Sequence, residues 1–187
     1  MTNDEKGRFA FIDDKTLREN LNRVFADIID FTSIMDSYSE NIQNNFHRAI
    51  ILYTAAIIEA LLHYIIEKKV RPLEFEEEEE WCFDGDPHVC HRYQDEDGKN
   101  IQIIAGKRFK KKKKITKNTQ FKQINNISLD KKLISGDLHK RIDEIRVLRN
   151  GLHLASLEDI EKKHSKQVLN RAFDTAREVT EIAEAIS

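Results

Sequence analysis

Apolar residues recur at helical spacing in four stretches of the chain, and this pattern predicts a mainly helical protein. The first stretch predicts an amphipathic helix over residues 14–35, and the second predicts a long helix over residues 39–69. A third helix follows Ser135, which offers a capping oxygen, and a last apolar face runs over residues 169–186. Four such helices can bury their apolar stripes against one another as a bundle.

The stretch between the second and third predicted helices has no sustained helical period. Short extended runs predict a charged β-hairpin insertion at about residues 73–127, with a turn at residues 95–100 where an Asp-Gly pair accommodates a positive φ. An acidic run over residues 76–80 and a basic run over residues 107–114 flank this turn at similar distances. They can face each other across the hairpin, where each opposite-charge pair contributes about 0.2 to 1 kcal/mol.

Composition agrees with one helical domain over residues 1–187. Of the 187 residues, 40% are hydrophobic and 34% are charged, and there are 6 glycines and 2 prolines. So few helix breakers allow long helices, and the length fits a single domain. The formal net charge of −2 gives no overall cationic field, so any attraction for nucleic acid must come from a local patch.

Sequence features favour a cytoplasmic location. The start of the chain has no basic head followed by an apolar stretch, so it does not read as a secretory signal. Residues 49–66 have the minimum length for a membrane span but contain Glu59 and His63, which favours a buried central helix and no membrane association. A membrane-attached protein, which would pellet with membranes, is the alternative.

The segment RVLRNGLHLA, residues 146–155, places a cluster of polar residues on the third predicted helix. At about 100° per residue, Arg146 and Arg149 share a helical face with His153. Asn150 lies slightly further round. Arginine offers a fixed planar charge for phosphate oxygens, and histidine can exchange a proton with a ribose 2′-hydroxyl or a 5′-leaving oxygen. The group can therefore cleave RNA without a metal ion, and the alternative is a solvated helix face.

Two further features favour a site. Asn150 and Gly151 are poor residues for a helix interior, glycine by about 1 kcal/mol relative to alanine, so a helix that tolerates them there is expected to gain packing or a site in return. Glu59 is the lone acid in the apolar part of the second helix, and a buried carboxylate needs a partner. We hypothesise that Glu59 pairs with Arg146 or Arg149 and orients it. A carboxylate at the bundle edge is the alternative.

Two segments resemble the HEPN superfamily of small α-helical bundles, which includes metal-independent endoribonucleases of toxin–antitoxin, phage-defence and CRISPR systems. LRNGLHLA is similar to the family's signature of arginine, polar residue and histidine, and RAIILYTAAIIEALLHYIIEK is similar to its early core helix. Arg149 stands closer to His153 than the family's usual spacing, whereas Arg146 lies within it. Either Arg146 is the matching residue, or Arg149 and Asn150 match a shorter variant.

The resemblance also implies partners. Family members pair two motifs across a dimer interface, so it implies a homodimer with a composite groove for RNA and no cofactor. It further implies an antitoxin or a nucleotidyltransferase-like protein as partner. Because some members are non-catalytic, it also leaves open a module that binds a partner protein or nucleic acid through the insertion.

The insertion carries two other groups of candidate residues. Adjacent Cys90 and His91 would point to opposite faces of a strand, and their spacing from Cys82 and His88 is unusual for zinc ligands, so no metal site is expected. The two cysteines are too few for a disulfide framework. A basic run has two interpretations, a solvated strand or an electrostatic guide for the RNA backbone. It consists of Lys110, Lys111, Lys112, Lys113 and Lys114.

Together these observations predict an HEPN-like bundle of four main helices with a β-hairpin insertion between the second and third. The predicted function is metal-independent cleavage of RNA in a toxin–antitoxin or phage-defence setting. His153 is the expected acid–base residue, Arg149 or Arg146 the phosphate binder, and Asn150 a polar orienter. The alternative is a non-catalytic HEPN-like binding module.

Overall fold

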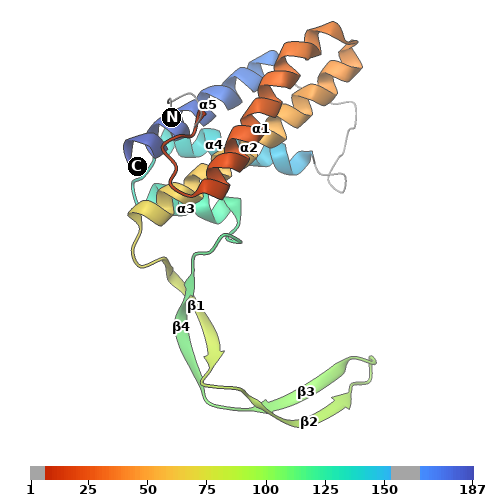
Figure 1. Ribbon diagram of the computed structural model, residues 1–187. Helices are drawn as coiled ribbons and strands as arrows, with labels where there is room; N and C mark the ends of the chain where they lie inside the picture. The colour runs from red at the N-terminus through yellow and green to blue at the C-terminus, as the bar shows by residue number, and fades with distance from the viewer. Residues whose placement is uncertain (1–6, 153–164) are drawn as a thin grey trace. The chain divides into compact units, whose positions relative to one another are not determined.

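The computed structural model describes residues 7–152 and 165–187, which form two compact units (Figure 1). The helical unit comprises Met1–Val70 and Thr119–Ser187, and the ribbon unit comprises Arg71–Asn118. The described helices are α1 (Lys15–Ile34), the 3-10 turn η2 (Met35–Ser37), α2 (Glu40–Lys69), α3 (Phe121–Asp130), α4 (Gly136–Gly151) and α5 (Lys166–Ala185). The described strands are β1 (Glu74–Phe83), β2 (His88–Gln94), β3 (Asn100–Ala105) and β4 (Arg108–Lys114).

Helix α2 forms the centre of the helical unit and contacts α1, α3, α4 and α5 (Figure 1). Its sequence is apolar around most of its circumference, so it needs neighbours on several sides. Ile58, Leu61 and Ile65 have no exposed surface. Each such side chain contributes about 1.5 to 3 kcal/mol through burial, so α2 supplies much of the stability of this unit.

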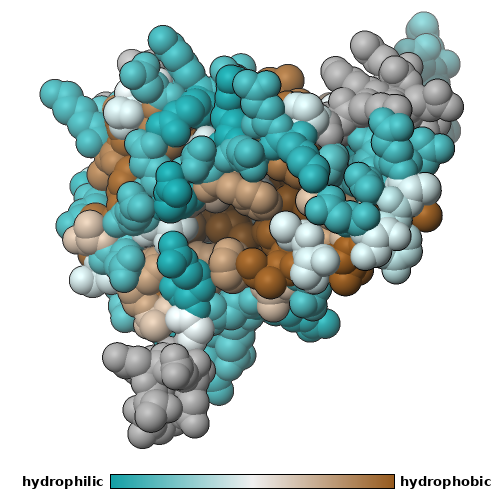
Figure 2. Space-filling model, turned by 90° about the horizontal axis from the view of Figure 1, so that it is seen from above, coloured by the Kyte–Doolittle hydropathy of each residue, from teal (hydrophilic) through white to brown (hydrophobic). Residues whose placement is uncertain are grey.

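Helix α2 is also the one described helix that is long and apolar enough to cross a membrane. However, 61% of its most apolar stretch is buried inside the protein. This burial is typical of the core helix of a soluble protein, in agreement with the expectation of a buried central helix. Figure 2 shows that apolar side chains also surface in the middle of one face of the molecule, surrounded by polar ones.

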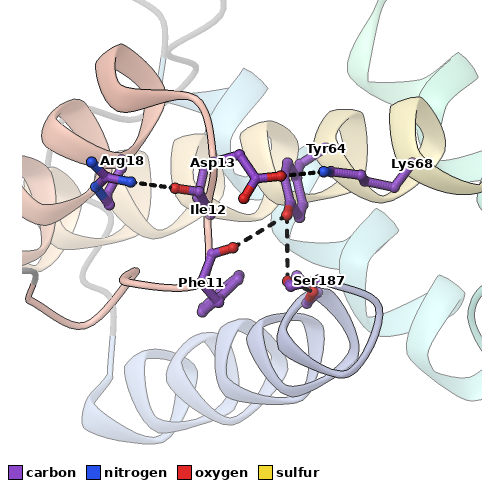
Figure 3. Close-up of polar contacts among 8 residues, drawn as sticks. Phe11, Ile12, Asp13, Arg18, Tyr64, Lys68 and Ser187 are labelled. Atoms are coloured by element: carbon purple, nitrogen blue, oxygen red, sulfur yellow. Dashed lines mark hydrogen bonds and ion pairs between the residues drawn. The ribbon is translucent and has the colours of Figure 1, made fainter. Parts of the chain in front are cut away.

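Polar contacts join both ends of the described chain to α2 (Figure 3). The Tyr64 hydroxyl of α2 lies 3.4 Å from the Phe11 carbonyl oxygen and 3.3 Å from the Ser187 hydroxyl. One turn later, the Lys68 ammonium donates a hydrogen bond to the Asp13 carboxylate, which lowers the pKa of that carboxyl. These contacts hold the segment before α1 and the end of α5 beside α2.

The expected bundle of four main helices, with a hairpin between the second and third, is wrong. The described chain has five α-helices, because α3 occupies the end of the stretch assigned to the insertion, so the third predicted helix is α4. Helix α3 is short, and its buried face includes the polar residues Asn125 and Ser128 beside Phe121 and Ile124. The side-chain amide of Asn125 donates a hydrogen bond to the His139 carbonyl oxygen at 3.1 Å, and this bond allows Asn125 to be buried. A polar residue on the buried face interrupts the spacing of apolar residues by which a helix is recognised in a sequence.

The ribbon unit is antiparallel and has two ladders rather than one. β1 pairs with β4, and β2 pairs with β3 as the inner hairpin. Where one ladder gives way to the other, the N–H of Asp84 donates to the Lys107 carbonyl at 2.8 Å. The predicted turn is present between β2 and β3. In it the Asp95 carboxylate accepts the N–H of Lys99 at 2.8 Å, and Gly98 has φ +79°.

The acidic and basic runs face each other across the outer ladder. Glu79 is the register partner of Lys112, and Glu80 is the register partner of Lys111. The register shifts between Glu74 and Glu79, so the pairing is not continuous along the acidic run. The expected arrangement of opposite charges is therefore present where the ladder is regular.

Candidate functional site

The candidate site lies at the C-terminal end of α4. This helix begins after Ser135, whose hydroxyl accepts the N–H of Leu138 at 3.1 Å, as the sequence predicts. Its buried stripe of Leu138, Ile142 and Ile145 packs into the helical unit, where α4 contacts α2, α3 and α5. The stripe fixes the helix, so polar side chains in its last turns have defined neighbours.

Arg149, in the last turn of α4, forms an ion pair with Glu59 of α2. Its Nη2 atom lies 3.5 Å from Oε2 of Glu59. This is one of the two partners that the sequence suggested for Glu59. The Arg149 side chain is 33% exposed and that of Glu59 is 24% exposed. The carboxylate thus holds the guanidinium while part of the arginine stays accessible to an anion in solution.

Burial dominates the titration of Glu59. It raises the pKa of Glu59 above its usual value, and the positive charge of Arg149 opposes this rise only in part. The ionised carboxylate is therefore less favourable here than in water, despite its partner.

Arg146 has a different environment. Its Nε donates to Oδ1 of Asp143 at 2.7 Å, one turn earlier in the same helix. This hydrogen bond lowers the pKa of Asp143. The Arg146 side chain is only 16% exposed. Of the two arginines that the sequence left open, Arg149 is therefore the more accessible to a phosphate group.

Asn150 and Gly151 do not lie in a helix interior, so that argument for a site is wrong. Helix α4 ends at Gly151, and the N–H of Leu152 donates to the Arg149 carbonyl at 3.2 Å. Glycine and asparagine are common at helix ends, where their low helix propensity costs little. Asn150 is exposed. His153 lies outside the described residues, so the shared helical face predicted for it stays a prediction.

The lysine run forms most of β4, and all five lysines are exposed. Lys110 forms an ion pair with Glu79 at 3.2 Å, and Lys111, Lys112 and Lys114 each have a glutamate as register partner. These carboxylates offset much of the positive field that would attract a phosphate backbone. The guide role of this run stays a prediction, and an unchanged salt dependence of RNA binding after neutralisation of the lysines would reject it.

The cysteines and histidines of the ribbon lie in separate ladders. Cys82 is in β1, whereas His88, Cys90 and His91 are in β2, where the register shifts between Val89 and His91. Among residues 7–152 and 165–187, no group of three or more His, Cys, Asp or Glu side chains is arranged to hold a metal ion.

His63 is a titratable residue to which the sequence argument gave no site role. It follows Glu59 by four residues in α2, so the two lie on the same face of that helix. Burial lowers the pKa of His63, while a hydrogen bond with the Thr119 backbone opposes this change. The acid whose charge acts on the pKa of His63 is Glu67, one turn further along α2, and it raises that pKa.

The described part of the site is thus a partly exposed arginine held by a carboxylate from a second helix. No family model matches the chain, and neither does any curated protein or solved structure.

Proposed function

We propose that the chain is a metal-independent endoribonuclease that uses Arg149 and His153 to cleave RNA. The ion pair between Arg149 and Glu59 carries the proposal, because it gives the arginine a fixed orientation and leaves a third of its side chain accessible. Arg149 stands four positions before His153 in the sequence. The resemblance of this segment to the HEPN signature supplies the second line of support.

In this mechanism Arg149 binds the nonbridging oxygens of the scissile phosphate. An imidazole takes the proton of the ribose 2′-hydroxyl as its oxygen attacks phosphorus, and the bond to the 5′-oxygen breaks. A protonated imidazole then gives a proton to that leaving oxygen. In the homodimer that the resemblance implies, His153 of each copy fills one of these two roles. DNA lacks the 2′-hydroxyl and is not cleaved.

Cleavage of an RNA oligonucleotide in EDTA tests the proposal, with a DNA oligonucleotide of the same sequence as substrate control. His153→Ala should slow cleavage by about 10² to 10⁴-fold, as expected for loss of a general acid–base group. His63→Gln is the matched control, since it removes another imidazole near Glu59. Wild-type protein that leaves RNA intact, or a His153→Ala variant that cuts at the wild-type rate, would contradict the proposal.

We place this activity in the cytoplasm, in a toxin–antitoxin or phage-defence setting with an antitoxin or nucleotidyltransferase-like partner. The burial of α2 favours a core helix over a membrane span, which a cytoplasmic protein requires. Expression of the wild-type protein should then slow growth, and His153→Ala should remove the effect. Harmless expression of an RNA-cleaving protein would contradict the toxin setting.

A second candidate is a non-catalytic binding module, and the surface of the ribbon unit favours it. The unit exposes several large apolar side chains, and aromatic side chains are enriched in protein–protein interfaces. These are Trp81, Tyr93, Ile103, Ile104 and Phe109. Within Arg71–Asn118 the sequence has as many Lys and Arg as Asp and Glu residues, so the unit has no net charge to attract nucleic acid and a protein partner fits better.

The nuclease and the binding module predict different results for the same double variant. The module predicts that a chain lacking cleavage activity in EDTA retains a protein partner on purification, and that Trp81→Ala with Phe109→Ala releases it. The nuclease predicts that the same double variant cleaves RNA at the wild-type rate. Cleavage by the wild-type protein that persists in the double variant therefore excludes the module as the sole function.

A further inference from the structure

Helices α3 and α4 carry a local excess of positive charge. Residues 119–152, which contain both helices, have seven Lys and Arg residues against four Asp and Glu residues, a net charge of +3. The whole chain has a net charge of −2 and therefore no cationic field of its own. Attraction of a nucleic acid requires a local patch of this kind.

Ion pairs match the arginines of this patch but not Lys122. Each arginine of α4 has an acidic partner, and Glu144 of α4 is paired with Arg171 of α5. Lys122 is exposed and forms no ion pair with any residue that the structure describes. The other acid of α3, Asp130, lies eight residues further on, about 12 Å along the helix axis. Surface charges are largely screened at that separation, so the charge of Lys122 is not compensated.

Lys122 lies beside a row of side chains on α4 that ends at Arg149. Asp143, Arg146 and Arg149 are spaced three residues apart, so they form one inclined ridge of the helix. The positive charge of Lys122 contributes to lowering the pKa of Asp143, which places the two side chains near each other where α3 packs on α4. Arg146 already donates to Asp143 at 2.7 Å. Lys122 is therefore available to another anion, and Asp143 beside it is only about 9 Å along the helix axis from Arg149.

Asn126 adds a hydrogen-bond donor beside Lys122. It follows Lys122 by four residues, so these two exposed side chains lie on the same face of α3. Its Oδ1 atom lies 3.0 Å from Nε2 of His139 in α4, and because the amide oxygen only accepts, His139 is the donor. This bond fixes the plane of the amide, whose NH2 group has no partner in the described part of the chain. Lysine and asparagine side chains are common donors to the phosphates of nucleic acids.

We propose that Lys122 and Asn126 of α3 bind a second phosphate group of the RNA, one that flanks the phosphate bound by Arg149. The inference rests on the proposed nuclease function, because Arg149 defines where the scissile phosphate lies. A contact of this kind adds affinity and fixes the position of the strand, but it does not read the base sequence. A dinucleotide has a single phosphate and cannot occupy both points, whereas an octanucleotide reaches from one to the other.

Binding of a 2′-O-methyl RNA octanucleotide, measured by fluorescence anisotropy from about 50 to about 200 mM salt, tests the contact of Lys122. This probe lacks the free 2′-hydroxyl and cannot be cleaved by the proposed mechanism. Lys122→Ala should weaken binding about fivefold and reduce the slope of log K against log salt by about 0.7. Lys15→Ala, which removes an exposed lysine of α1, is the matched control and should not change the slope. An unchanged slope in Lys122→Ala, or an equal change in Lys15→Ala, overturns the proposal.

The same binding assay tests the amide of Asn126. Asn126→Asp keeps an oxygen that accepts from His139 but replaces the NH2 group by a second carboxylate oxygen, which repels phosphate. This variant should bind the octanucleotide about tenfold more weakly than wild type. Asn45→Asp, an equal change of charge at an exposed asparagine of α2, should bind within about twofold of wild type. Equal losses in the two variants would show a general effect of net charge and would overturn the role of Asn126.

Cleavage of RNA substrates of two lengths separates the second phosphate site from the scissile one. Wild-type protein should have a lower KM for an octanucleotide than for a dinucleotide, and Lys122→Ala should reduce this advantage about fivefold. Equal losses on both substrates would place Lys122 at the scissile phosphate and overturn the proposal. If the wild-type protein cleaves neither substrate, the nuclease function fails, and the two binding measurements then decide the phosphate site on their own.

Discussion

Replacing Glu59 by glutamine should leave stability nearly unchanged while impairing activity. At the observed separation of 3.5 Å from Arg149, the gross attraction is about 5 kcal/mol for an effective dielectric constant of about 20. Burial nevertheless raises the pKa of Glu59, so the loss of hydration outweighs this attraction. Glutamine keeps the shape and removes the buried charge. The free energy of unfolding at pH 7 should therefore stay within about 1 kcal/mol of wild type.

The pH dependence of the free energy of unfolding shows whether ionisation of Glu59 stabilises or destabilises the fold. Because the pKa of Glu59 in the folded protein is raised above its ordinary value of 4.5, its contribution to stability is complete below pH 4.5. That contribution is lost as the pH rises through the folded-state pKa. Glu59→Gln lacks this titration. Urea unfolding of both proteins should show the stability of the variant rising relative to wild type as the pH increases from about 4 to about 7.

The activity assay separates orientation from stability. Without its carboxylate partner Arg149 loses a fixed orientation, and misplacement of this kind costs up to about 10²-fold in cleavage rate. Glu67→Gln, an exposed acid of the same helix, should leave cleavage unchanged. The reasoning is refuted if Glu59→Gln loses more than about 2 kcal/mol at pH 7 and recovers it in acid, the behaviour of a net stabilising ion pair. Full cleavage by Glu59→Gln would refute the orienting role.

Three further predictions concern stability. Gly98→Ala should destabilise the inner hairpin by about 1 to 2 kcal/mol because Gly98 has φ +79°, and faster amide exchange in β2 and β3 would show it. Asp143→Asn should lower the free energy of unfolding at pH 7 by about 0.2 to 0.5 kcal/mol. Since the pKa of Asp143 is lowered from 3.8, the loss should vanish as the pH falls through the folded-state pKa in urea titrations. Lys112→Glu places like charges opposite Glu79 and should speed amide exchange in β1 and β4, whereas Lys117→Glu, outside the ladder, should not.

The long helices and the inner turn could be predicted because their signals are local. Helix α2 has an uninterrupted apolar sequence, and Gly98 stands where a tight turn requires a positive φ. Helix α3 could not be predicted in this way, because two polar residues lie on its buried face. Asn125 bonds to the His139 carbonyl of α4, a partner that the sequence does not identify, and Ser128 bonds to the Ile124 carbonyl within α3. The pairing of the ribbon strands shows the same limit, since the register shift after Glu74 depends on the partner strand.

The candidate site was predictable where one residue stood out from its surroundings. Glu59 is an isolated acid in an apolar helix, and its need for a partner identified an arginine of α4. The end of α4 at Gly151 was not predictable from periodicity, because the spacing of apolar residues continues past it. The choice between Arg146 and Arg149 required their side-chain neighbours, since both lie on the apolar edge of the same helix.

The most direct test of the account compares Arg149→Ala with Arg146→Ala in RNA cleavage with EDTA present. Loss of the phosphate-binding group should reduce the rate by about 10² to 10³-fold in Arg149→Ala. Arg146→Ala, which removes a mostly buried arginine bonded within its own helix, should change the rate much less. An inactive wild-type protein, or a larger loss in Arg146→Ala than in Arg149→Ala, would contradict the account.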